Sequence, residues 1–221
     1  MNLTQPAGTH SLAALFQAVE KALRLNQNLL NQADTSNGDH GDQMVAVFQI
    51  AVQAASELQA AGPAEAMERA GTLLESTLAS AEALTYAHGL RQVAAQLQQR
   101  SISLAELLAL LKRSAGGEIH LDAQDGESRT GEVLKALTAG LANWNRVEHG
   151  KNPLGSPLDM GVMFEFGMAY MQARQEYTDR VEILAEAAVA ASPLSAIACQ
   201  RLSGVIAFKA LLRAAAELDR L

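Results

Sequence analysis

The chain has 221 residues and a formal net charge of −7, and only 4% of its residues are aromatic. This length allows a sizeable core but fits one domain, so we expect a single domain spanning residues 1–221. The negative charge and the lack of a long Lys/Arg run exclude a typical nucleic-acid-binding surface, because phosphate contacts need clustered basic side chains.

Composition also predicts the fold class and the compartment. Abundant Ala and Leu favour an all-α protein over a sheet rich in β-branched residues. The N-terminus has no basic segment followed by an apolar run, and the most apolar stretch, 183–199, contains Glu186 and Pro193. Cys199 is the only cysteine, so no disulfide can form within the chain. We therefore expect a cytoplasmic protein without a membrane span.

Hydrophobic residues in the first hundred positions recur with the spacing of amphipathic helices. A first helix is expected over 11–30, followed by a polar loop, and a second over 44–58. Ala61-Gly62-Pro63 ends the second helix and starts a third. The segment 64–99 is too long for one ordinary helix, so we divide it near Ala79-Ser80-Ala81.

The second half continues the helical pattern around two loops. Ser103 and Glu106 form a capping-box motif that predicts the start of a fifth helix, which ends near Ser114. Pro193 separates the last two helical stretches. About eight helices and no strand are expected in all. After Ser114 the predicted elements are a Gly- and Asp-rich loop over 115–129, a helix over 134–144, a loop over 147–157, and helices over 160–191 and 194–221.

The most informative segment is the polar loop at 32–44. It contains Asp34, Asp39 and Asp42 together with two glycines and His40. Glycines allow a backbone course that lets carboxylate oxygens converge, and hard divalent cations bind such oxygen clusters. Asp and Asn are also ordinary turn and N-cap residues, so a purely structural loop is the alternative interpretation.

Gly38-Asp39-His40-Gly41, followed by Met44 and an amphipathic helix, resembles the signature of the DhaL, or Dak phosphatase-like, family. In that family an Asp-x4-Asp-Gly-Asp-His-Gly loop joins the first two helices, and its three aspartates hold two magnesium ions against nucleotide phosphates. The resemblance implies metal ligands at Asp39, Asn37 and Gln32, so only one of the three carboxylates is retained here.

Weaker matches follow in the family's order. Ser80 matches the serine of a phosphate-binding Gly-rich turn, although the flanking glycines are replaced by alanines. Thr130 ends a stretch similar to the family's Gly-Asp-Lys-Thr-Met loop, and Arg174 and Arg180 lie in a stretch similar to Arg-Ala-Ser-Tyr-Leu-Gly-Glu-Arg. With His40, these four residues are the nucleotide-binding residues that the resemblance implies.

The resemblance implies an antiparallel helical barrel that binds Mg²⁺ and ADP or ATP, as one component of a dihydroxyacetone (glycerone) kinase or a related phosphotransferase. Such a chain would need a separate DhaK-like, substrate-binding subunit. The main alternative is a catalytically silent binding or regulatory protein with a degenerate metal site. A third reading is a different small-molecule enzyme that uses His40 or His149 as a general base, although neither has an evident orienting partner in the sequence. No catalytic residue is assigned.

Overall fold

The computed structural model describes residues 9–58, 62–78, 81–99, 105–106, 108–109 and 160–217. Within these residues the protein is all-α, and no strand is present, which confirms the predicted fold class. The described elements are α1 (Thr9–Leu25), α2 (Gln27–Ala33), α3 (His40–Glu57), α4 (Pro63–Thr77), α5 (Ala81–Gln99), α8 (Met160–Glu176), α9 (Arg180–Ala190), the 3-10 helix η3 (Pro193–Ala196) and α10 (Ala198–Glu217).

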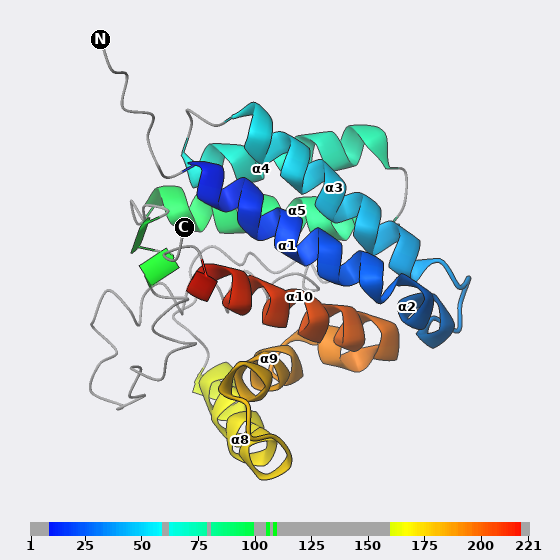
Figure 1. The fold of residues 1–221 in the computed structure, drawn as a ribbon, viewed down its shortest axis with the longest axis vertical. Helices are drawn as coiled ribbons and strands as arrows, with labels where there is room; N and C mark the ends of the chain where they lie inside the picture. The colour runs from blue at the N-terminus through cyan, green and yellow to red at the C-terminus, as the bar shows by residue number, and fades with distance from the viewer. Residues whose placement is uncertain are drawn as a thin grey trace.

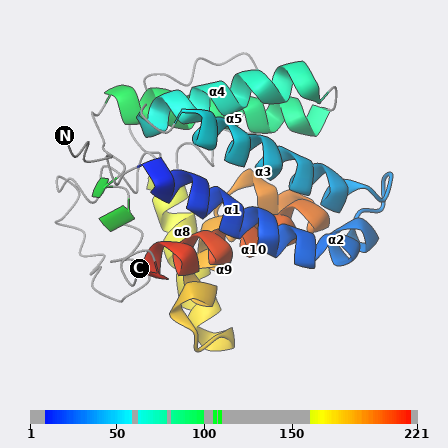
Figure 2. The same cartoon turned by 45° about the horizontal axis from the view of Figure 1, so that its top comes forward.

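The helices form a series of packed neighbours in the spatial order α5, α4, α3, α1, α10, α9 and α8. Figure 1 shows α1 between α3 and α10, and both of these helices run antiparallel to it. In Figure 2 the pair α4 and α5 again lies on the far side of α3 from α1, and Figure 1 shows α8 and α9 below α10. Closure of this series into a barrel stays a prediction.

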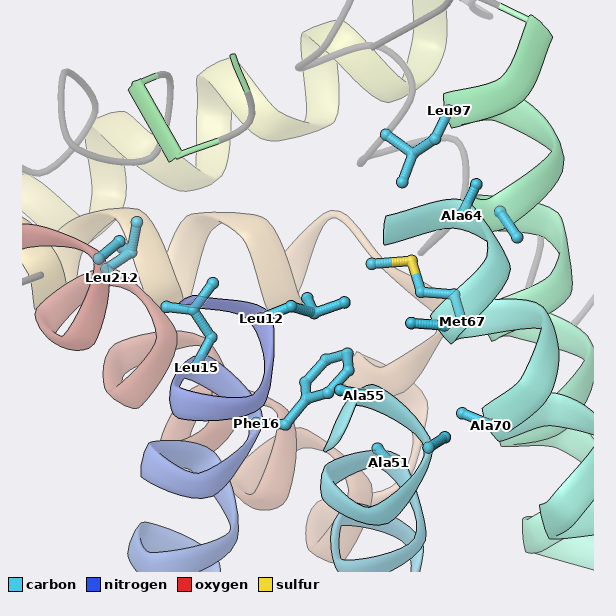
Figure 3. Packing of buried hydrophobic residues seen from close by; sticks show 14 residues of the cluster. Leu12, Leu15, Phe16, Ala51, Ala55, Ala64, Met67, Ala70, Leu97 and Leu212 are labelled. Carbon is cyan, nitrogen blue, oxygen red and sulfur yellow. The ribbon is translucent and has the colours of Figure 1, made fainter. Parts of the chain in front are cut away.

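A core of aliphatic side chains and alanines joins the central helices (Figure 3). Phe16 of α1 lies against Phe48 of α3 in an edge-to-face contact with ring centroids 6.3 Å apart. Small residues on α3 and α4 let these helices approach closely, which explains how a chain with few aromatic residues fills its interior. The residues labelled in Figure 3 are Leu12, Leu15, Phe16, Ala51, Ala55, Ala64, Met67, Ala70, Leu97 and Leu212.

The predicted first helix is wrong in one respect, because the chain breaks at Asn26 into α1 and α2. The Asn26 backbone N–H donates to the Leu23 carbonyl at 3.0 Å, and its side-chain amide donates to the Ala22 carbonyl at 2.8 Å. Leu23 and Leu30 are nevertheless both fully buried in the same cluster. The break therefore leaves the hydrophobic spacing intact, which is why periodicity alone predicted one helix.

Several other boundaries are confirmed. Pro63 is the first residue of α4, and the Gly62 N–H before it donates to Glu65 at 2.9 Å. The division of 64–99 falls between Thr77 and Ala81. The long stretch 160–191 is interrupted at 177–179, where Asp179 caps α9 by accepting from the Val181 N–H at 2.8 Å. The Ser103 cap, the helix over 134–144 and both predicted loops of the second half lie outside the described residues.

Candidate functional site

The acidic loop, residues 34–39, joins α2 to α3 and forms the right-hand tip of the molecule in Figure 1. Gly38 has φ +74°, in the left-handed region that glycine adopts without a steric penalty. This residue turns the chain so that α3 can start at His40. The glycine predicted to shape the loop therefore has the conformation that makes it necessary.

The Asp34 carboxylate organises the loop from within. It accepts hydrogen bonds from the backbone N–H groups of Ser36 at 2.9 Å, Gly38 at 3.1 Å and Asp39 at 3.3 Å. These bonds, led by the one from Ser36, lower the pKa of the Asp34 carboxyl below its ordinary value, because they stabilise its charged form. Asp34 thus acts as a turn-forming aspartate, with its oxygens directed to the loop backbone.

The first turn of α3 is held against α2 by Asn31. The Asn31 Oδ1 accepts from the N–H groups of Gly41 at 2.7 Å and Asp42 at 3.3 Å, two donors that have no partner within the helix at its N-terminus. Contact is so close that a Cβ on Gly41 would lie 2.3 Å from the Gln27 carbonyl oxygen and 2.7 Å from Asn31 Oδ1. Only glycine fits at this crossing.

Side-chain amides contact the other two carboxylates. Gln27 donates to Asp42 Oδ1, and the Asn31 Nδ2 donates to Asp42 Oδ2 at 3.0 Å. The Gln43 Nε2 donates to Asp39 Oδ1 at 2.7 Å. Asp34, Asp39 and Asp42 therefore all accept hydrogen bonds from the protein's own N–H groups.

His40 begins α3 but points into the bundle, where its side chain is 1% exposed. Its Nε2 lies 3.0 Å from the hydroxyl of Ser203 on α10, and that hydroxyl donates to the Gln200 carbonyl at 3.0 Å. When the hydroxyl proton is directed to Gln200, the hydroxyl oxygen accepts from Nε2 in the tautomer that carries the ring proton there. The pair ties the end of the acidic loop to a helix far away in the sequence.

The predicted metal ligands all lie on or beside this loop. Asp39 is partly buried, whereas Asn37 and Gln32 are exposed. No group of three His, Cys, Asp or Glu side chains suited to a metal ion occurs among the residues described above. Asp34 and Asp42, the other two carboxylates of the predicted loop, are bonded to backbone or amide N–H groups. The donor set therefore does not fit the two-magnesium site that the resemblance implies.

The predicted nucleotide-binding residues are not all brought together. Arg180 follows Asp179, which accepts from Arg213 of α10 at 3.2 Å, whereas His40 contacts Ser203 of the same helix. Ten residues of α-helix span about 15 Å, so these two contacts lie well apart along α10. Arg174 is exposed near the end of α8. Ser80, Thr130 and His149 lie outside the described residues.

Three residues that shape the site were not predicted from the sequence: Gln27, Asn31 and Ser203. A short polar residue near a helix end is too common to single out Asn31, and Ser203 lies 163 positions from its partner His40. The spacing between Asn31 and Gly41 predicts their contact only once it is known that α2 and α3 cross at this point.

No protein-family model, curated protein or solved structure matches this chain. None of the helices in the described ranges is both long and apolar enough to cross a membrane. What is established is an all-α protein whose acidic loop is held by its own hydrogen bonds.

Proposed function

We propose that this chain is a DhaL-like binding or regulatory protein that does not carry out magnesium-dependent phosphoryl transfer. The observation that carries the proposal is that N–H groups of the protein already bind the carboxylates in and beside the acidic loop. The carboxylates of Asp34, Asp39 and Asp42 each accept hydrogen bonds from protein N–H groups. These bonds already compensate the carboxylate charges without a cation.

Charge balance supports the same proposal. Phosphoryl transfer depends on cations that neutralise the charge spread over the transferred group. At the three positions equivalent to the family's ligands, only Asp39 is charged, because Asn37 and Gln32 supply neutral amide oxygens. Two dications beside a polyphosphate would lack two of the three negative ligands that hold them.

The second candidate is the nucleotide-binding component of a dihydroxyacetone kinase, which would act with a DhaK-like subunit. It is favoured by the exposure of Asn37 and Gln32 and the partial exposure of Asp39, because solvent-facing oxygens can reach a hydrated Mg²⁺. In this candidate Arg174 or Arg180 would offset phosphate charge. A phosphate contact from His40 would require its ring to leave Ser203 and become exposed.

A cytoplasmic location is part of both candidates. The single cysteine, Cys199, is buried in α10, so it is suited to a core position and needs no oxidising compartment.

Isothermal titration with ADP and ATP, with and without Mg²⁺, separates the two candidates. The kinase-component candidate predicts magnesium-dependent binding by the unmodified chain. The silent-protein proposal predicts no heat with this chain and a gain of magnesium-dependent binding in the double variant Gln32→Asp, Asn37→Asp. Magnesium-dependent heat from the unmodified chain would refute our proposal.

The matched control is the double variant Gln49→Asp, Gln172→Asp. It adds the same two charges at exposed positions on α3 and α8. It should not bind nucleotide, because its new carboxylates are not at the positions that the resemblance assigns to metal ligands. Equal binding by the control and the loop variant would attribute any gain to net charge alone.

A further inference from the structure

Asn31 uses both atoms of its side-chain amide at the corner between α2 and α3. Its oxygen accepts from the N–H groups of Gly41 and Asp42, and its nitrogen donates to Asp42 Oδ2 at 3.0 Å. Gln27, one turn earlier on α2, donates to the other Asp42 oxygen. Both oxygens of Asp42 are therefore held by amide donors from a neighbouring helix.

These two amides stabilise the negative charge of Asp42, as a bound cation would. The Asp42 carboxylate sits in the first turn of α3, where the helix dipole favours a negative charge. Two amide N–H groups add partial positive charge at hydrogen-bonding distance, and hydrogen bonds to a charged acceptor are stronger than those between neutral groups. An aspartate at position 31 could still accept from Gly41 but would repel Asp42.

The acidic loop connects the two helices that Asn31 and Gln27 hold together. Asp34 follows the last residue of α2, and its carboxylate bonds three backbone N–H groups of the loop. His40 anchors the other end of the loop to Ser203. Each end of the loop and its centre are thus fixed by contacts that need no additional ligand.

We infer that the side-chain amides of Asn31 and Gln27 take the place of a divalent cation at this corner, so that the acidic loop is ordered without bound metal. This inference holds whatever the bundle binds and does not rest on the proposed function. It makes Asn31 the positioning residue of the loop, because its side chain bonds both the N-terminus of α3 and the Asp42 carboxylate.

The first test uses the unmodified full-length chain and the metal alone. Its thermal unfolding midpoint should be the same in EDTA, in millimolar magnesium or calcium chloride, and in sodium chloride of matched ionic strength. A rise in Tm specific to the divalent salts, or a loss in EDTA, would overturn the inference. Nucleotide binding plays no part in this measurement, so its result is distinguishable from that of the titration above.

The second test compares Asn31→Asp with Gln53→Glu. Each change replaces an amide donor facing a carboxylate by a second carboxylate, since Gln53 donates to Glu57 at 2.7 Å on the outer face of α3. The Asn31 variant should lower Tm by on the order of 5 °C, because it loses a bond to a charged acceptor and sets two charges together. The Gln53 variant should lower Tm by only about 1–2 °C.

Equal losses from the two variants would show that Asn31 has no special place in the loop and would refute its positioning role. If Asn31→Asp does not fold, Gln27→Glu is the substitute, because Gln27 faces Asp42 without bonding the N-terminus of α3. Its Tm should also fall further than that of Gln53→Glu. Hydrogen exchange at the amides of Ser36 and Gly38 should be faster in the Asn31 or Gln27 variant and unchanged in Gln53→Glu.

Discussion

Replacing Gly41 by Ala tests the closest contact of the site. A Cβ at this position would lie 2.3 Å from the Gln27 carbonyl oxygen, whereas ordinary contacts begin near 3.4 Å. The two helices would have to separate by about 1 Å, because the obstacle is backbone and cannot rotate away. Separation would also stretch the 2.7 Å bond from the Gly41 N–H to Asn31.

The expected cost follows from these contacts. Overpacking costs about 1–3 kcal/mol, and loss of the Asn31 bond adds about 0.5–1.5 kcal/mol. Alanine's better helix propensity returns up to about 1 kcal/mol, which leaves a net loss of roughly 2 kcal/mol. For a chain of this length, that loss lowers Tm by about 4–8 °C.

Thermal and urea unfolding followed by far-UV circular dichroism measure this effect. The control is Gly167→Ala in α8, where an added Cβ meets nothing within 4 Å. That variant should be unchanged or raised by up to about 2–4 °C, because only helix propensity changes. If Gly41→Ala matched the control, the close crossing of α2 and α3 would be wrong.

Two further measurements test the loop's hydrogen bonds. Ser203→Ala removes the acceptor of the buried His40 and should lower the free energy of unfolding by about 1–3 kcal/mol. The control Ser195→Ala, in the exposed 3-10 helix, should lower it by less. Equal losses in urea unfolding would contradict the buried pair. Because the pKa of Asp34 is lowered on folding, its stabilising contribution is present above the ordinary carboxyl pKa and disappears as the pH falls through the folded value. Asp34→Ala should therefore flatten the loss of stability below about pH 4, and an unchanged acid limb would contradict this role.

Local chemistry predicted the helices well where a strong signal marked a boundary. Gly62-Pro63 placed the start of α4 correctly, because proline fixes φ and lacks the N–H that a first-turn residue leaves unbonded. The break at Asn26 was missed because Leu23 and Leu30 stay in helical phase across it and are both buried. Hydrophobic spacing reports which residues face the core, and it does not report a change of axis that preserves this spacing.

The position of the polar loop was predicted, but the hydrogen bonds of its carboxylates were not. The sequence indicated a polar loop in which glycines allow backbone conformations that other residues resist, and Gly38 has such a conformation. It did not indicate that the amides of Asn31 and Gln27 would bond Asp42, because such pairings depend on how α2 crosses α3. Contacts between residues of different helices are fixed by packing angles, which composition and spacing do not specify.

The packing also limits where a polyphosphate could find positive charge. Ser203 places the His40 end of the site near the start of α10, whereas Asp179 and therefore Arg180 lie by Arg213, about 15 Å further along that helix.

Two arginines close in sequence to this end, Arg201 beside Ser203 and Arg24 at the end of α1, are already paired. Arg201 of α10 donates to Glu186 at 3.1 Å, and Arg24 of α1 is paired with Glu20. A nucleotide at this end would have to compete with both carboxylates for those guanidinium groups. The neutral side chains of Asn37 and Gln32 would attract Mg²⁺ less strongly than carboxylates, so less cation charge would offset the phosphates. Under the proposed function, the hydrogen bonds and ion pairs at this end would therefore weaken the binding of a magnesium nucleotide there.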